Sequence, residues 1–417
     1  MGKFGLVLSG GVAKGAYEVG VIKALAETGM VPDVCVGISA GALNGAMMSG
    51  MIAGGEFTPP VVKERLEETW VERVTLSHFY HAYDGDDFHQ DLDKKSLNNL
   101  FLRFGIDPVN KVYLPTKLDP NALKTLENIL RGNFISMFSH AYFRQLANDF
   151  NFPHTVKRGI KFSAVLSNLM GETSLDETDE RIKQGWTRYE DFHWYPNMSK
   201  SDGFIQYSRL IDVIMASSSF PMAFSPMRLS IPGSSKPGLF IDGGMADNAP
   251  IGKVIGLDPD VDTILVVMAT TIVPPLEEEP QNVFQVFNRM SEMLAGKFII
   301  NNYHKVMKVN RRIQALGQVL QKDEDGQYLD SEFNELMSVA AGFTNLADFR
   351  RRRVVRIVPL FPSTPLKGDL FAGFLDKKLR REYVDMGYAN AMETIQKRLL
   401  APDGPGTPDP AFPSFAG

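Results

Sequence analysis

At the start of the chain, apolar runs typical of buried strands alternate with apolar positions at helical spacing. An apolar run over residues 5–8 predicts a buried strand, and from about Ala16 apolar positions recur at helical spacing until Gly29, which suits a helix C-terminus. A second apolar run over 34–36 leads through a glycine-containing turn into a helix of small residues over 39–48. The order strand, helix, strand, helix predicts an α/β fold with a mostly parallel sheet.

The same patterns of apolar positions predict further helices and strands beyond residue 50. Between about 56 and 155 the sequence predicts a mostly helical insertion, with helices over 61–74 and 121–130, which could cover a site on the sheet. A further helix is expected over 210–216. Strand patterns are predicted over 159–169, 239–242, 263–268 and 353–360.

The C-terminal region, about 280–400, is expected to consist mainly of helices. The helical patterns cover 283–321, 331–349 and 371–399. Residues 401–417 contain five prolines and three glycines, which predicts a disordered tail. We therefore expect one domain over 1–400, followed by this tail.

Composition and charge narrow the class of protein. The 417 residues carry a formal net charge of −5 and are 44% hydrophobic and 22% charged, as in an ordinary globular protein. No basic excess favours nucleic acid as a partner. Cys35 is the single cysteine, so no internal disulfide can form, and the spacings of zinc ligands are absent. Without a signal peptide or an apolar run of ~20 residues, we predict a cytoplasmic protein, or one exported without an N-terminal signal.

The turn after the second strand carries the first candidate for chemistry. Gly37-Ile38-Ser39-Ala40-Gly41 has the G-x-S-x-G pattern of a nucleophile elbow, in which a serine sits on a sharp turn between a strand and a helix. The N-terminus of that helix would place its positive dipole end at the serine hydroxyl. The alternative is a glycine-rich turn that matches the pattern by chance.

The glycine-rich loop after the first strand supplies candidate donors for an oxyanion. Backbone N–H groups of Gly10, Gly11 and Val12 can face a bound oxygen, with the helix behind them. The alternative is a phosphate-binding loop for a nucleotide. Gly10 and Gly15 fit the glycines of a Walker A loop, but Ala16 follows where lysine is needed, and Val12 breaks G-x-G-x-x-G. We therefore prefer the oxyanion interpretation.

The base that would activate Ser39 is better sought among carboxylates than among histidines. None of the seven histidines falls on a predicted loop that closes a strand, and only His304 follows Asp242 in the chain, inside a predicted helix. Asp242 ends a predicted strand and precedes Gly243-Gly244. Ser39 and Asp242 would then project from the same edge of a parallel sheet. A simple Asp-Gly-Gly turn is the alternative.

These blocks together resemble the patatin-like phospholipases. Ser9-Gly10-Gly11-Val12-Ala13-Lys14-Gly15 resembles the oxyanion loop of this family. Residues 37–41 resemble its nucleophile elbow, and Asp242-Gly243-Gly244 resembles the segment that carries its catalytic aspartate. Residues 216–221 and 247–250 are similar to the segments before and after that aspartate. Val12 stands where the family usually has a third glycine. Because valine adopts a positive φ only at a cost, this position departs from the pattern.

The resemblance implies a fold, a reaction and a set of site residues. It implies a three-layer α/β/α catalytic domain over 1–400 and a Ser-Asp dyad, with Ser39 as nucleophile and Asp242 as general base, that cleaves acyl esters of lipids. Gly10, Gly11 and Val12 would form the oxyanion hole, and no metal or cofactor is implied. The implied supporting residues are Gly37, Gly41, Lys14, Gly15, Gly243 and Gly244.

The chemistry of the dyad sets two further expectations. A free aspartate is a weak base at pH 7, so we expect burial to raise the pKa of Asp242. The expected substrates are phospholipids or lysophospholipids, with peripheral contact to a membrane, while the oligomeric state is not predicted. The alternative is a catalytically silent relative that binds a lipid or a partner. An acidic stretch from Asp84 to Asp93 lacks the ligand order of an EF-hand, and we interpret it as a solvated loop.

Overall fold

The computed structural model describes most of the N-terminal 75 residues, most of the C-terminal half and several shorter segments between them. The described residues are 2–75, 106–107, 112–113, 136–138, 140, 144, 159–169, 189–194, 207–230, 237–270, 279 and 283–399. The predicted helix over 121–130, most of the predicted insertion, the acidic stretch from Asp84 to Asp93 and the predicted tail over 401–417 lie outside these ranges.

An eight-stranded sheet forms the centre of the protein. Its strand order is β12-β11-β1-β2-β6-β10-β9, and β7 also pairs with β6. The five strands from β12 to β6 run parallel, whereas β7 and β10 run antiparallel to β6. This confirms the predicted mostly parallel sheet. The strands are β1 (Lys3–Leu8), β2 (Val34–Ile38), β6 (Lys161–Asn168), β7 (Tyr189–Trp194), β9 (Met227–Ser230), β10 (Pro237–Asp242), β11 (Val261–Val267) and β12 (Arg356–Leu360).

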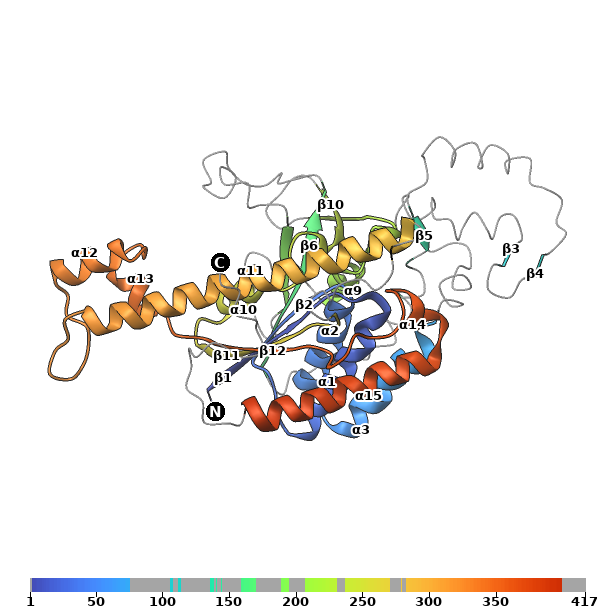
Figure 1. The fold of residues 1–417 in the computed structure, drawn as a ribbon, viewed down its shortest axis with the longest axis horizontal. Helices are drawn as coiled ribbons and strands as arrows, with labels where there is room; N and C mark the ends of the chain where they lie inside the picture. Colours follow the sequence, from blue (N-terminus) through green and yellow to red (C-terminus); the bar gives the residue numbers. More distant parts are fainter. Residues whose placement is uncertain are drawn as a thin grey trace.

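Helices lie on both faces of this sheet, which gives the predicted three layers (Figure 1). The principal helices are α1 (Ala16–Glu27), α2 (Ala40–Gly54), α9 (Tyr207–Ser217), α10 (Ile251–Leu257), α11 (Val283–Val319) and α15 (Lys377–Thr394). The remaining α-helices of the described residues are α3 (Pro59–Val62), α12 (Glu332–Ala340), α13 (Leu346–Arg351) and α14 (Ala372–Leu375). Two small ladders pair β3 (Ile106–Asp107) with β4 (Val112–Tyr113), and β5 (Ser136–Phe138) with β8 (Met222–Phe224).

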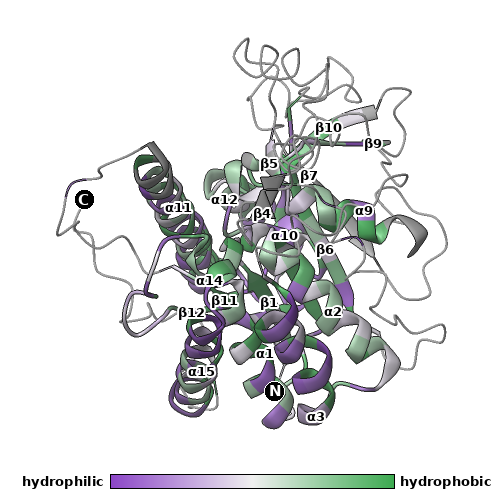
Figure 2. Cartoon of the chain, turned by 90° about the vertical axis from the view of Figure 1, so that its right-hand side faces the viewer, coloured by the Kyte–Doolittle hydropathy of each residue, from purple (hydrophilic) through white to green (hydrophobic). Residues whose placement is uncertain are grey.

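Alternation along the parallel strands divides the core in two. Leu6, Leu8 and Cys35 point into a core shared with α1, α2 and α15. Val7 and Val36 point to the opposite face and pack with α10 and α11. Because the strands are covered on both sides, both sets of positions are apolar, and Figure 2 shows the strands mainly green while hydrophilic residues gather on the outer helices α11 and α15. None of the helices in the described part of the chain combines the length and apolar composition needed to cross a membrane.

The long helix α11 crosses the molecule and extends beyond the sheet (Figure 1). At its far end α12 and α13 fold back on it around a separate small core. The prediction of one helix over 331–349 is wrong, because the chain turns at Gly342 with a φ of 87° and Asn345 caps a new helix. The predicted helix over 371–399 is likewise interrupted, at Asp376, whose carboxylate caps α15.

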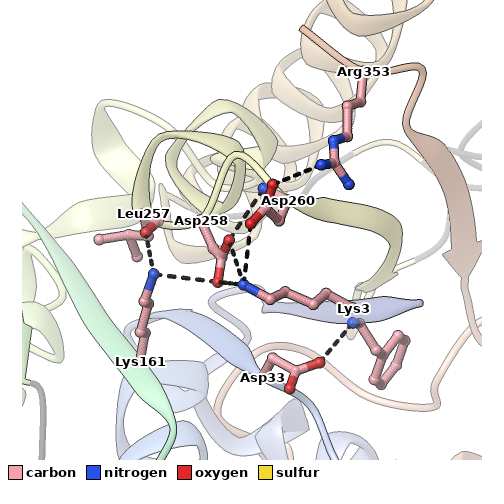
Figure 3. A network of polar contacts seen from close by, with 8 residues as sticks. Lys3, Asp33, Lys161, Leu257, Asp258, Asp260 and Arg353 are labelled. Atoms are coloured by element: carbon pink, nitrogen blue, oxygen red, sulfur yellow. Dashed lines mark hydrogen bonds and ion pairs between the residues drawn. The ribbon is translucent and has the colours of Figure 1, made fainter. Parts of the chain in front are cut away.

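A cluster of charges ties the strand ends that lie opposite the candidate site (Figure 3). Asp258, after α10, accepts hydrogen bonds from Lys3 at 2.9 Å and from Lys161 at 3.2 Å, so it joins the first residues of β1 and β6. Asp260 pairs with Arg353 at 3.0 Å. The lysines are about half exposed, and the contribution of such pairs to stability is small, so this edge serves mainly to fix the strand register.

Candidate active site

Ser39 occupies a strained turn between β2 and α2. Its φ of 54° and ψ of −124° lie outside the regions that ordinary residues prefer, at a cost of about 1–3 kcal/mol. The turn is crowded as well. A Cβ at Gly37 would lie 2.4 Å from the carbonyl oxygen of Gly41, and a Cβ at Gly41 would lie 2.3 Å from the carbonyl oxygen of Leu8. Side chains at either position would therefore push the turn apart.

Serines at the end of α9 hold this strained turn in place. The N–H of Ser39 donates to Oγ of Ser217 at 3.0 Å, and that hydroxyl donates onward to the carbonyl oxygen of Val165 at 2.8 Å. The carbonyl oxygen of Ser39 accepts from Oγ of Ser218 at 3.2 Å. Both the N–H and the carbonyl oxygen of Ser39 are therefore held by a segment that is far away in the sequence.

Asp242 ends β10 and is fixed by the same serine segment. Its N–H donates to the carbonyl oxygen of Ser219 at 3.0 Å, and its Oδ1 accepts the N–H of Gly244 at 2.8 Å. Its other oxygen, Oδ2, is buried without a regular hydrogen bond to the described residues. Burial raises the pKa of Asp242 to about 6, while the nearby Ser39 hydroxyl and the Gly244 N–H partly oppose the rise. The expected direction of this pKa shift is therefore confirmed.

Asp242 reaches the serine by a route that differs from the expected one. We expected its strand to run parallel to that of Ser39, but β10 is antiparallel to β6, so that part of the prediction is wrong. Asp242 pairs with Leu166, and Ile38 pairs with Val165 on the same strand. Because β10 ends in this register, the two side chains still meet at one edge of the sheet and line one pocket.

The three predicted oxyanion donors are not equivalent. The N–H of Gly10 donates to Oδ1 of Asn248 at 2.8 Å, so this group is already engaged. The N–H groups of Gly11 and Val12 make no hydrogen bond within the described residues, and both residues line the pocket with Ser39. Val12 adopts a φ of 49° in spite of its β-branched side chain. The loop therefore takes the left-handed conformation that the family's glycine would adopt freely.

Close packing fixes the supporting glycines. A Cβ at Gly15 would lie 2.5 Å from Cβ of Ala40, and a Cβ at Gly243 would lie 2.1 Å from the carbonyl oxygen of Val165. A Cβ at Gly244 would lie 2.9 Å from Oδ1 of Asn248. Gly15 therefore lets the loop pack against the start of α2, and Gly243 lets the aspartate turn pack against β6.

A buried polar network that sequence reasoning missed joins the glycine-rich loop after β1 to helix α2. Asn44, on α2, donates to the carbonyl oxygen of Gly15 at 3.0 Å and to Oε2 of Glu18 at 2.9 Å. Nε1 of Trp70 donates to Oδ1 of Asn44 at 2.6 Å. Burial raises the pKa of Glu18 well above its usual value, and the hydrogen bond from Asn44 partly opposes this rise. Asn44 follows Ser39 by little more than one helical turn, and this spacing is the one feature of the sequence that could have indicated its role.

No hydrogen bond joins Ser39 to a histidine within the described residues. Nε2 of His140 lies 2.9 Å from Oγ of Ser219, behind the aspartate, and the ring of His304 packs against Tyr303. Across the described ranges, no group of three or more histidine, cysteine, aspartate or glutamate residues is placed to hold a metal ion.

The site opens into a pocket of about 410 Å³, a space that includes part of the solvent at its mouth. Its lining contains Ser39 and Asp242 beside residues 291, 292 and 295 of α11. Most of its other side chains are apolar, namely Val12, Phe220, Met245, Ala295 and Leu370. The pocket therefore places the serine and the carboxylate on one wall and a helix on another.

Comparisons with known proteins show which family this chain resembles. A family model described as patatin-like phospholipase matches residues 6–255. Lysophospholipase nte1 of Aspergillus terreus is 58% identical over 43 residues, which cover 10% of this chain and 3% of that protein. The structure of VipD from Legionella pneumophila has a TM-score of 0.35 and 15% identity and covers 95% of this chain and 67% of its own. The type III effector ExoU has a TM-score of 0.30 and 13% identity, with coverages of 96% and 54%.

Proposed function

Because the chain belongs to the patatin-like phospholipase family, a family of lipid hydrolases, we propose that it cleaves carboxylic esters of phospholipids or lysophospholipids through Ser39 and Asp242. The observation that carries this proposal is the pairing of these two side chains, 203 positions apart in sequence, at one edge of the sheet and in one pocket. We assign the catalytic domain to residues 1–400, with an insertion at about 56–155.

The proposed reaction begins with proton transfer from Ser39 to Asp242. Oδ2 of Asp242 takes the proton while Oγ of Ser39 attacks the ester carbonyl carbon. The carbonyl oxygen becomes an oxyanion, which the N–H groups of Gly11 and Val12 stabilise. The tetrahedral intermediate collapses to an acyl-serine, and the alcohol leaves with the proton. Asp242 then deprotonates a water molecule, which releases the fatty acid and restores Ser39.

Burial of Asp242 suits it to this role. A carboxylate with a pKa of about 6 is a stronger base than a solvated aspartate, yet it is still mostly ionised at neutral pH. The Oδ1 bond from Gly244 orients the carboxylate and leaves Oδ2 to face the proton. A histidine is therefore unnecessary for the proposed mechanism.

The lining of the pocket supports a lipid acyl chain as the part of the substrate that enters. Its apolar residues would surround the chain, while the polar groups converge on the ester. The head group would then lie toward the mouth and the membrane surface, so we propose an enzyme that acts from the aqueous side with peripheral contact. The mechanism needs no cofactor.

The test is product analysis by lipid mass spectrometry with wild type, Ser39→Ala and Asp242→Asn side by side. We expect wild type to release fatty acid from phospholipid or lysophospholipid and both variants to fall by at least about 10³-fold in kcat. A Ser49→Ala protein serves as control, since this buried hydroxyl makes no hydrogen bond to any of the residues that the structure describes. Normal hydrolysis by Asp242→Asn would refute the dyad. Lipid binding without turnover in wild type would favour a silent lipid-binding relative.

A further inference from the structure

The first turns of α11 have an apolar outer face over the candidate site. Val286, Met290, Met293 and Leu294 recur at intervals of three and four residues, so they share one face of the helix. Between 38% and 55% of each of these residues is exposed. Ala295 follows Val286 by two and a half helical turns, so it lies on the inner face, where it lines the pocket. A surface helix normally turns polar side chains outward, and this part of α11 departs from that pattern.

The same face continues along α11 as a row of basic side chains. Lys297, Lys308 and Arg311 are exposed, and they follow Met293 by 4, 15 and 18 residues, which are close to whole numbers of helical turns. The whole of α11 contains six lysines and arginines and one glutamate, in a protein whose net charge is −5. Positive charge is therefore concentrated on one helix of an acidic protein.

We propose that these four apolar and three basic residues form a docking face for the surface of a membrane that contains anionic lipids. This inference rests on the proposed function and deepens it by naming the part of the molecule that meets the membrane. Interfacial helices combine apolar side chains, which enter the boundary of the acyl chains, with lysines and arginines, which contact anionic head groups. An acidic protein or a nucleic acid would match the basic row but would leave the four apolar side chains in water.

The position of the docking face suits delivery of a lipid to the pocket. The outer face of α11 carries the exposed apolar residues, and the inner face of the same turns lines the pocket with Ser39. A helix with its side chains is about 10–12 Å across, so a bound membrane would lie about that far from the pocket. A lipid drawn from this membrane would pass the width of one helix to reach Ser39.

The test measures vesicle binding by the Ser39→Ala protein, which does not consume the lipids. Flotation with phosphatidylcholine vesicles is compared with flotation with vesicles that also contain phosphatidylglycerol. We expect binding to the mixed vesicles that weakens in high salt. Lys297→Gln together with Lys308→Gln should lower the affinity about 30-fold, because each basic residue near an anionic surface contributes about fivefold. Met290→Gln together with Met293→Gln should lower it at least about tenfold, since the membrane would cover the exposed half of each residue.

Two controls carry the same changes elsewhere on the surface. Lys63 and Lys378 are exposed and belong to the segment after α3 and to α15, which pack on the other face of the sheet from α11 (Figure 1). Their joint replacement by glutamine should leave the affinity within about twofold, because salt screens charges this far from the membrane. Leu336, on α12, is 63% exposed, and Leu336→Gln should leave vesicle binding as it was.

Several results would overturn the proposal. Absence of binding to the mixed vesicles would do so directly. An equal loss in both lysine pairs would mean that net charge alone attracts the protein, and an equal loss in Leu336→Gln would place the membrane contact away from the pocket. Undiminished binding by the methionine pair would indicate a purely electrostatic site, as for an acidic protein or a nucleic acid.

Two further measurements keep the results separable. Thermal melts identify a variant that fails to fold, in which case the other pair on α11 decides. Hydrolysis of a soluble short-chain ester by the protein with Ser39 intact needs no vesicle and tests the proposed function by itself. A protein that binds the mixed vesicles but is inactive on this ester would refute the hydrolase and support the docking face.

Discussion

Removing the hydroxyl of Ser217 tests how the strained nucleophile turn is held. This side chain is fully buried, accepts the N–H of Ser39 at 3.0 Å and donates to the carbonyl oxygen of Val165 at 2.8 Å. In Ser217→Ala both backbone groups stay buried without a partner. Each such group costs about 1–3 kcal/mol, so the free energy of unfolding should fall by about 2–6 kcal/mol.

The same substitution should impair catalysis more than binding. Without its hydrogen bond, the Ser39 peptide can relax from its φ of 54° toward an ordinary conformation, which would turn Oγ away from the carbonyl. A misplacement on the order of 1 Å costs about 10²-fold in rate, so kcat should drop by about that factor while KM changes little.

The matched control is Ser49→Ala, on the helix that follows Ser39. This serine is equally buried, but its Oγ has no hydrogen-bond partner in the described part of the chain, so its loss should leave the unfolding free energy within about 1 kcal/mol of wild type. Urea unfolding followed by circular dichroism, together with an ester hydrolysis assay, gives both quantities. If the two variants behave alike, the proposed role of Ser217 is wrong.

Four further predictions concern the dyad and its loop. Because Asp242 acts as a base with a pKa of about 6, kcat/KM should rise with pH through about 6 and then level off, and a flat profile would argue against it. Folding raises the pKa of Asp242, so the protonated carboxyl contributes its full stability below about pH 3.8, and this contribution is lost as the pH rises through about 6. Above pH 6, the free energy of unfolding of Asp242→Asn should therefore exceed that of wild type by up to about 3 kcal/mol, with a correspondingly higher melting temperature. Gly10→Ala should reduce kcat by about 10²-fold, because the new Cβ would lie 3.0 Å from Cβ of Ser39, and a melting curve checks that the fold survives. Val12→Gly should keep kcat within about threefold, since glycine adopts the same φ and retains the N–H, and a larger loss would mean that the valine side chain itself contributes.

The parts of the site that the sequence could predict are those that depend on neighbours in the chain. A strand, a turn with glycines at 37 and 41, and a helix of small residues specify the elbow locally, because a Cβ at either glycine would clash with the backbone of the crowded turn. The glycine loop after β1 is local in the same sense. Asp242 was found from its strand end and the two glycines that follow it.

What could not be predicted depends on contacts between distant segments. The direction of β10 is set by its pairing with β6, so the sequence around Asp242 gave no sign that the strand runs antiparallel. The engagement of the Gly10 N–H depends on Asn248, which is 238 positions away in the sequence. Glu292 lines the pocket from α11, a long helix whose charges follow no motif, so this position could not be predicted from the sequence. The division between domain, insertion and tail stays a prediction.

The central claim, that Ser39 is a nucleophile activated by Asp242, is tested most directly by labelling with a fluorophosphonate and locating the adduct by mass spectrometry. We predict one adduct, on Oγ of Ser39, formed at a rate that falls by at least about 10²-fold in Asp242→Asn although that variant is folded and more stable. An adduct on another residue, or labelling of Ser39 at an undiminished rate in Asp242→Asn, would contradict the account.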